Sequence, residues 1–303
     1  MISIDMLPVY PEFRQVSLDD RPMFEAILSD HPSEISEKTF GSVYAWRSYG
    51  HRSELAQLDG HLIISWYKKA FGRVILEPVG PNPASVVDRL AREIHPRDEP
   101  IKGVYGLIEP SVSELRLIGR EPVSLSDDWD YVYLTKDLIG LEGPKYHTQR
   151  KEMRKATLEH DLVYEPMTKD HQRECLELEE TWCDLKHCTF DKLSEAEDLA
   201  LKESVANLDE LGFLGGVLLV DGKLQALTVG ERLNPKTAVV HFEKANPMIR
   251  GLYQVINQQF CEHALKDYEF TNREQDMGEP GLRRAKEGYH PHHCVQKHIL
   301  KFE

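Results

Sequence analysis

The chain has 303 residues, of which 41% are hydrophobic and 29% are charged, a composition typical of globular proteins. Its formal net charge of −14, from 37 basic and 51 acidic residues, excludes general attraction to nucleic acid or to an anionic membrane. Either could be bound only through a local basic patch. No apolar run approaches the roughly 20 residues of a membrane span, so we expect no transmembrane segment.

Apolar spacing and turn residues predict the elements of the first half of the chain. We expect a helix over residues 18–28, an aromatic-rich segment over 36–49, a hairpin of strands 53–58 and 61–67 around Asp59-Gly60, a strand over 73–76, a helix over 84–94, a strand over 103–108, a helix over 112–117 and a strand over 129–134. The length suits two domains of about 150 residues each. Glycines at 140 and 143 mark a boundary, which predicts domains 1–142 and 143–303.

The second half repeats this order of elements. We expect a basic helix over 145–155, a strand over 162–165, helices over 169–184 and 194–208, a hairpin of strands 215–220 and 224–231 around Asp221-Gly222, a strand over 237–244, a helix over 251–265 and strands over 268–271 and 295–302. Both halves contain helices, an Asp-Gly hairpin, a strand, a helix and a strand. This is the pattern of a duplicated α/β unit, although Asp-Gly hairpins are common enough for coincidence to remain the alternative.

The five cysteines are odd in number and irregularly spaced, which predicts reduced thiols and a cytoplasmic protein. Separately, we expect either a monomer or a weak dimer. Cys183, His187 and Cys188 are close in sequence, but no second ligand pair follows at the spacing of a zinc site. We therefore expect no metal.

Polar residues follow the apolar strand at 237–244. The strand ends in Glu243-Lys244, a turn at Asn246-Pro247 comes next, and Arg250-Gly251 opens the next helix. A helix N-terminus offers unpaired N–H groups and positive potential, which favour an anion or a phosphate, and a glycine there allows close approach to the backbone. Arg250 and Gly251 are therefore candidate donor-binding residues.

The segment from Asn272 to Lys286 mixes acids, bases and hinge residues directly after a strand. Simple core packing does not require that mixture, and loops on rigid scaffolds are where binding and catalysis concentrate. We expect Gly278 and Gly281 to let this loop fold back along the strand ends.

A strand, then Pro-x-x-Arg-Gly, then a helix and a further strand resembles the cofactor-binding half of the acyl-CoA N-acyltransferase (GNAT) fold. In that fold two adjacent strands splay apart and the acyl donor lies between them. A wider set of motifs is similar to the C-terminal domain of phosphatidylglycerol lysyltransferases. These motifs are Thr39-Phe40 to Trp46, Tyr131-Val132-Tyr133, Leu141-Glu142-Gly143, the basic helix, Phe242-Glu243-Lys244-Ala245, Gly251-Leu252-Tyr253-Gln254, Ile256-Asn257, Asn272-Arg273-Glu274-Gln275-Asp276-Met277-Gly278, Gly281-Leu282-Arg283, Lys286 and Tyr289-His290-Pro291.

The resemblance covers most of the chain and implies its fold and its class of reaction. It implies an α/β (α+β) protein of two tandem GNAT-like domains, each a mixed, mostly antiparallel sheet flanked by helices, as in the peptidoglycan-bridge aminoacyltransferases. It implies transfer of an acyl or aminoacyl group, with aminoacyl-tRNA or acyl-CoA as the donor cosubstrate and no tightly bound cofactor. The acceptor would be an amine or hydroxyl on a small molecule or a peptide. We expect the C-terminal domain to hold the active cleft and the N-terminal domain to be structural.

Four residues are candidates for catalysis. Glu243 could act as general base, or instead form an ion pair with Lys244 or Arg273. Lys244 could hold a developing oxyanion, or pair with an acid. Glu274 could orient a substrate ammonium, or cap the next helix. Tyr289, in a run with three histidines, could protonate a leaving group, although such a run around a proline is also typical of a solvated turn.

The remaining candidates bind substrate or donor. Arg273 could hold a carboxylate or phosphate, and Asp276 shares a strand face with Glu274. Tyr253 and Asn257 lie one helical turn apart and could line the pocket floor, and Tyr253 could equally be a core residue. Three more candidate substrate- or donor-binding residues lie in the 272–286 segment: Asn272, Arg283 and Lys286.

The basic helix is the only dense positive patch in the sequence. It contains Lys145, Arg150, Lys151, Arg154 and Lys155, and it could contact a tRNA backbone or be a solvated face. Two alternatives to a transferase therefore stay open: a non-catalytic module of the same fold that binds a small anionic metabolite, and a tRNA-associated factor.

Overall fold

The computed structural model describes residues 3–47, 53–68, 70–93, 100–186 and 192–302, without the side chains of 183–186 and 192–195. The ends of two predicted segments, at residues 48–49 and 94, lie outside this part, as do His187 and Cys188. The chain forms two compact units, Met1–Trp129 with Val295–Glu303, and Asp130–Cys294. These bounds differ from the expected domains, because residues 130–142 belong to the second unit and the last residues to the first.

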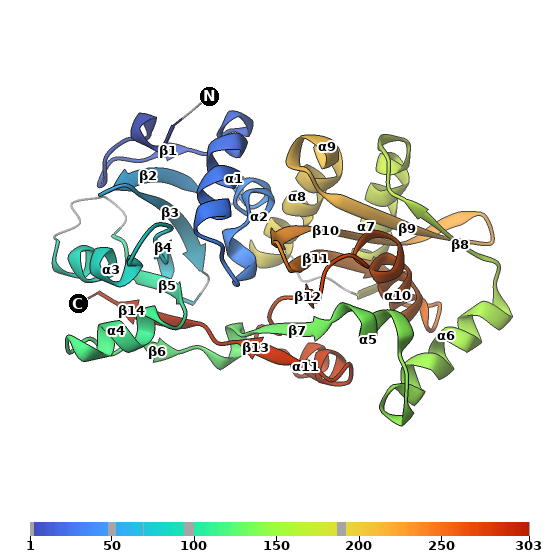
Figure 1. Cartoon of the computed structure of the whole chain (residues 1–303). Helices are drawn as coiled ribbons and strands as arrows, with labels where there is room; N and C mark the ends of the chain where they lie inside the picture. The colour runs from blue at the N-terminus through green and yellow to red at the C-terminus, as the bar shows by residue number, and fades with distance from the viewer. Residues whose placement is uncertain (1–2, 48–52, 69, 94–99, 187–191, 303) are drawn as a thin grey trace. The chain divides into compact units, whose positions relative to one another are not determined.

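Within the described residues, the first unit contains a seven-stranded sheet (Figure 1). Its strands, in order across the sheet, are β1 (Arg14–Gln15), β2 (Glu54–Leu58), β3 (His61–Lys68), β4 (Gly72–Leu76), β5 (Gly103–Leu107), β14 (His298–Lys301) and β6 (Val123–Ser124). Neighbours are antiparallel except β4 and β5. The helices are α1 (Arg21–Asp30), α2 (Phe40–Ala45), α3 (Pro83–Arg92) and α4 (Ser111–Leu117), with short 3-10 turns η1 (Ile4–Met6), η2 (Leu18–Asp20), η3 (Ser36–Lys38) and η4 (Ser126–Asp128).

The second unit contains the other sheet of seven described strands. Their order is β13 (His293–Val295), β7 (Asp130–Leu134), β12 (Phe270–Asn272), β11 (Thr237–Ala245), β10 (Lys223–Asn234), β9 (Leu214–Val220) and β8 (Leu162–Pro166). The helical segments are α5 (Thr135–Gly140), η5 (Pro144–Tyr146), α6 (His147–Glu159), η6 (Lys169–His171), α7 (Gln172–Lys186), α8 (Lys192–Ala206), α9 (Leu208–Leu211), α10 (Leu252–Ala264) and α11 (Pro280–Glu287). Helix α10 packs on β9, β10 and β11, and its residues Leu252, Ile256 and Phe260 are fully buried.

The two sheets have the same order of neighbours. In each, four strands pair antiparallel, a parallel pair comes next (β4 with β5, β11 with β12), and the strand after it is antiparallel again. Both Asp-Gly hairpins form as predicted, with left-handed φ of 50° and 76° at Asp59-Gly60 and of 51° and 77° at Asp221-Gly222. This correspondence supports the interpretation of the chain as a duplicated unit.

The prediction of one strand over 295–302 is wrong. This stretch contributes to two strands, of which β13 joins the sheet of the second unit and β14 that of the first. Between them, Lys297 leaves the ladder: its carbonyl accepts a hydrogen bond from Leu125 N–H, and its fully buried ammonium pairs with Glu37 at 2.6 Å. The buried Lys297 ammonium needs the Glu37 carboxylate beside it, and this pairing interrupts the strand.

Gly251 is required by helix packing. Its φ is +91°, and a Cβ at this position would overlap the carbonyl group of Glu152 on α6. The backbones of α6 and the start of α10 therefore touch here.

We predict that Gly251→Ala lowers the free energy of unfolding by about 2 kcal/mol or more, because it combines a left-handed backbone with a steric overlap. Urea denaturation measures the change. Gly281→Ala is the matched control: a Cβ at Gly281 has no neighbour within 4 Å, so we expect a change within about 0.5 kcal/mol. Equal effects of the two substitutions would contradict the packing role.

Candidate active site

The parallel pairing of β11 with β12 is short. It comprises Thr237 with Phe270, Ala238 with Thr271 and Val239 with Asn272. Strand β12 then ends, whereas β11 continues to Ala245, so the two chains diverge beyond these pairs. On its other edge β11 bulges, because Val229 pairs with Phe242 and Gly230 with Val240, which leaves His241 as the extra residue. Bulges re-aim side chains at functional sites.

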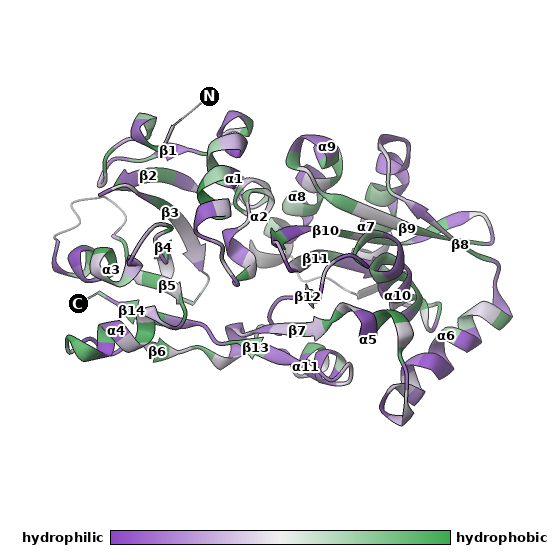
Figure 2. Ribbon diagram, in the orientation of Figure 1, coloured by the Kyte–Doolittle hydropathy of each residue, from purple (hydrophilic) through white to green (hydrophobic). Residues whose placement is uncertain are grey.

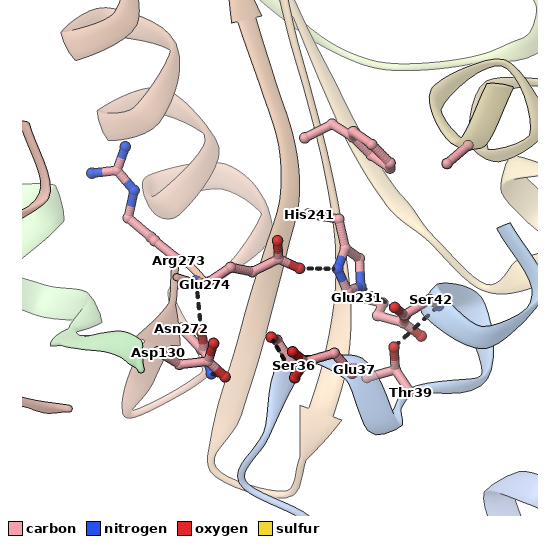
Figure 3. Close-up of polar contacts among 12 residues, drawn as sticks. Ser36, Glu37, Thr39, Ser42, Asp130, Glu231, His241, Asn272, Arg273 and Glu274 are labelled. Carbon is pink, nitrogen blue, oxygen red and sulfur yellow. Dashed lines mark hydrogen bonds and ion pairs between the residues drawn. The ribbon is translucent and has the colours of Figure 1, made fainter. Parts of the chain in front are cut away.

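His241 lies between two carboxylates (Figure 3). Its Nδ1 is 2.7 Å from Glu274 Oε1, and its Nε2 is 2.9 Å from Glu231 Oε1. The side chain of His241 is 2% exposed. Burial alone would lower the pKa of this imidazole, but the hydrogen bonds to Glu231 and Glu274 outweigh burial and raise the pKa to about 10. His241 is therefore an imidazolium at neutral pH, and both of its N–H groups are already donated.

Glu274 is the member of this group that a ligand can reach. Its side chain is 25% exposed, and its Oε2 has no hydrogen-bond partner in the part of the chain that the structure describes. Glu274 can therefore bind a cation or accept a proton at its second oxygen, whereas His241 can do neither.

Most of the predicted site residues in the 272–286 loop bind one another. The N–H of Glu274 donates to Asn272 Oδ1 at 2.7 Å, and Asn272 Nδ2 donates to Asp130 at 3.1 Å. Asp276 accepts hydrogen bonds from Arg283 Nε at 2.7 Å and from the Tyr131 hydroxyl at 2.6 Å. Burial opposes ionisation of Asp276, but these donors prevail and lower its pKa to about 2. The ammonium of Lys286 is bound to backbone carbonyls of the same loop.

A second cluster of predicted residues is linked through Glu243. Its two carboxylate oxygens accept hydrogen bonds from Arg273 Nη2 at 3.0 Å and from Asn257 Nδ2 at 2.9 Å. The Arg273 guanidinium lies 4.8 Å from the ring centre of Tyr289, and burial raises the pKa of that phenol. Arg273 and Glu274 point in opposite directions (Figure 3), so Tyr289 and Glu243 belong to a different group from Glu274.

Lys244 and Tyr253 form a third cluster, with helices α7 and α8. The ammonium of Lys244 is 2.6 Å from Glu197 and 3.6 Å from Glu179, and it lies 3.6 Å from the ring centre of Trp182. The Tyr253 hydroxyl accepts a hydrogen bond from the Trp182 indole at 2.7 Å. Burial lowers the pKa of Lys244, but the two carboxylates outweigh it and raise the pKa. Lys244 is thus occupied within the chain.

The predicted phosphate contacts divide into occupied and available groups. Arg250 forms an ion pair with Glu152, Lys145 lies 3.5 Å from Asp137, and Arg150 donates to the carbonyls of Leu141 and Gly143. Lys151 and Arg154 are exposed and have no partner among the described residues. Figure 2 shows α6 as a mostly hydrophilic helix. An available basic face therefore remains on α6.

Sequence analysis missed Glu231 and His241. His241 stands inside the apolar run Val239-Val240-His241-Phe242 and Glu231 inside β10, where alternation predicts buried apolar residues. Each of two adjacent predicted strands contains one ionisable residue in an apolar stretch. Buried ionisable groups need partners, so this signal could have indicated that Glu231 and His241 contact one another.

Among the described residues, the structure contains no group of three or more His, Cys, Asp or Glu side chains placed to hold a metal ion. Nor does any described helix combine the length and apolar character needed to cross a bilayer.

Two mostly antiparallel sheets flanked by helices define the fold as that of the tandem GNAT proteins. Within this class, the chain belongs to the family described as phosphatidylglycerol lysyltransferase, C-terminal, whose profile matches residues 29–301.

Three solved structures show the likeness. A conserved protein of unknown function from Bacteroides thetaiotaomicron is 29% identical with a TM-score of 0.88, over 96% of this chain and 99% of that chain. L-PGS from Bacillus licheniformis is 14% identical with a TM-score of 0.62, over 93% and 92%. A tandem GNAT protein from the clavulanic acid biosynthesis pathway is 10% identical with a TM-score of 0.53, over 96% and 98%. No curated protein matches the sequence.

The raised pKa of His241 predicts a pH-dependent stability. The folded pKa of about 10 exceeds the ordinary 6.5, so the stabilisation is full below pH 6.5 and is lost as pH rises through about 10. We expect the difference in unfolding free energy between the wild type and His241→Gln to shrink by a few kcal/mol over this interval. Urea denaturation at several pH values measures it. Between pH 5 and pH 6 the difference should be constant, and a difference independent of pH from 5 to above 10 would contradict the buried imidazolium.

Proposed function

We propose that the protein is a transferase that moves an aminoacyl or acyl group from a carrier to an amine or hydroxyl on a small molecule or peptide. The observation that carries this proposal is the Glu274 carboxylate, which is fixed by His241 and stands at the divergence of β11 and β12. In the GNAT fold the donor lies between the two strands that diverge. The site therefore combines a place for the donor with a group that can take a proton.

Glu274 Oε2 would receive the acceptor amine and accept the proton that the amine loses on attack. The amine nitrogen forms a bond to the acyl carbon, and the ester C–O bond of an aminoacyl-tRNA, or the C–S bond of an acyl-CoA, breaks. The leaving oxygen or sulfur takes up that proton, which Glu274 releases. Backbone N–H groups of β11 at the divergence are the donors that suit the oxyanion, because the Lys244 ammonium is held by Glu179 and Glu197.

Aminoacyl-tRNA is the donor that these observations favour. The exposed face of α6 and the family of the chain favour an RNA-borne donor.

The test offers the purified protein bacterial tRNA charged with labelled amino acids and, separately, labelled acetyl-CoA, each with a panel of amines and dipeptides. We expect saturable transfer from charged tRNA. Failure of a folded sample to bind or to use either donor would refute the proposal.

Glu274→Gln should lower kcat by about 100-fold or more and leave the Kd for charged tRNA within about two-fold, since the amide can occupy the same space but cannot accept the proton. Single-turnover rates and filter binding measure the two quantities. Glu287→Gln, which changes an exposed acid at the last residue of α11, is the matched control and should retain full activity. Equal rates for Glu274→Gln and the wild type would remove Glu274 from the mechanism.

Lys151→Ala combined with Arg154→Ala should weaken the binding of charged tRNA and reduce the slope of log K against log salt by about 2, because two phosphate contacts are lost. The comparison variant is Lys223→Ala with Lys266→Ala, which removes the same charge at exposed positions elsewhere in the unit. If both double variants change the slope equally, α6 does not make a specific contact with tRNA.

A non-catalytic binding module is the second candidate. It is favoured by the ion pairs of Glu243 and Lys244, which show that two predicted catalytic groups are satisfied within the chain. This alternative predicts ligand binding with no turnover, and Glu274→Gln would then have no rate to change. Binding of uncharged and charged tRNA with equal affinity and no transfer would instead indicate a tRNA-associated factor.

A further inference from the structure

The ammonium of Lys286 lies inside the turn that carries Glu274. Lys286 comes from α11, is 8% exposed, and its Nζ lies 2.5 Å, 3.0 Å and 2.6 Å from the carbonyl oxygens of Arg273, Glu274 and Gln275. An ammonium has three N–H groups, so its donor capacity matches these three consecutive carbonyls. No donor is left for a substrate.

The turn needs such a partner because of its backbone. Glu274 has a φ of +57°, a left-handed conformation that costs about 1 kcal/mol or more for a residue with a Cβ. Three successive carbonyls converge there, and their dipoles repel one another without a cation between them. Two other hydrogen bonds hold the backbone of Glu274. Its N–H donates to Asn272 Oδ1, and its carbonyl oxygen accepts from the N–H of Tyr131.

We propose that Lys286 is a positioning residue, whose ammonium holds the 273–275 turn in the conformation that brings the Glu274 carboxylate against His241. The sequence indicated a substrate contact for this lysine, and the geometry assigns it to the chain instead. The geometric part of this inference stands by itself. Its catalytic consequence rests on the proposed function.

The charges around Lys286 fit this role. Arg273, Glu274, Asp276 and Asp130 face its ammonium, and its Nζ is 5.9 Å from the ring centre of Tyr131. Burial dominates and lowers the pKa of Lys286 to about 8.

The experiment uses Lys286→Met, which keeps the length of the side chain, and Lys286→Arg, which keeps the charge but spreads its donors in a plane. The imidazole of His241 is followed by nuclear magnetic resonance of the histidine-labelled full chain and assigned with His241→Gln. Glu274→Gln gives the reference shift for loss of the carboxylate. Lys297→Met, which removes an even more deeply buried lysine from the first unit, controls for general destabilisation.

We expect both Lys286 variants to lower the pKa of His241 by at least half of the decrease seen in Glu274→Gln, and Lys297→Met to leave it unchanged. Given a functional assay, kcat should fall at least ten-fold with KM within two-fold. A His241 titration identical to the wild type in either folded Lys286 variant would overturn the proposal. If Lys286→Met does not fold, Lys286→Arg decides. The resonance result holds whether or not transfer is found, so the two proposals fail separately.

Discussion

The candidate site depends on where the parallel pairing of β11 with β12 stops. Three paired residues hold the strands together, and the bulge at His241 then turns a side chain toward the chain beyond β12. Gly230 permits this bulge, because a Cβ there would overlap the carbonyl of Val239. If the pairing continued, Arg273 and Glu274 would be ladder residues with alternating faces. Because it stops, Glu274 can adopt a left-handed conformation and meet the imidazole.

The charges at this site are arranged in self-satisfied groups. Glu231 and Glu274 share the imidazolium, Glu243 binds Arg273, and Asp276 binds Arg283. Buried charges are costly unless they are paired and hydrogen-bonded, so pairing on this scale fixes each side chain in one position. One carboxylate oxygen on Glu274 is left over. The network fixes the position of the Glu274 carboxylate. Fixed polar groups of this kind distinguish a preorganised site from a polar surface.

The sequence allowed the fold to be predicted more fully than the site. Asp-Gly turns and alternating apolar residues identify both hairpins, because these signals are local. Part of the 272–286 segment is also recognisable as a loop, although its residues from Pro280 onward form helix α11. The partners of its side chains are not recognisable, because composition alone does not say whether Asn272, Asp276 and Lys286 face a ligand or one another. His241 escaped notice because a bulge has no periodic signature, and because a single histidine in an apolar strand usually belongs to the core.

The duplicated units differ in the course of the chain beyond their parallel pairs. In the first unit Glu77 comes directly after β4, and its N–H donates to the carbonyl of Tyr105 on β5, so the two chains stay paired. The buried acids there have buried bases: Glu77 lies 2.7 Å from Lys38, and Glu37 lies 2.6 Å from Lys297. In the second unit the chains separate beyond the parallel pair. Continued pairing suits a structural unit, whereas divergence suits the unit that we propose to bind the donor.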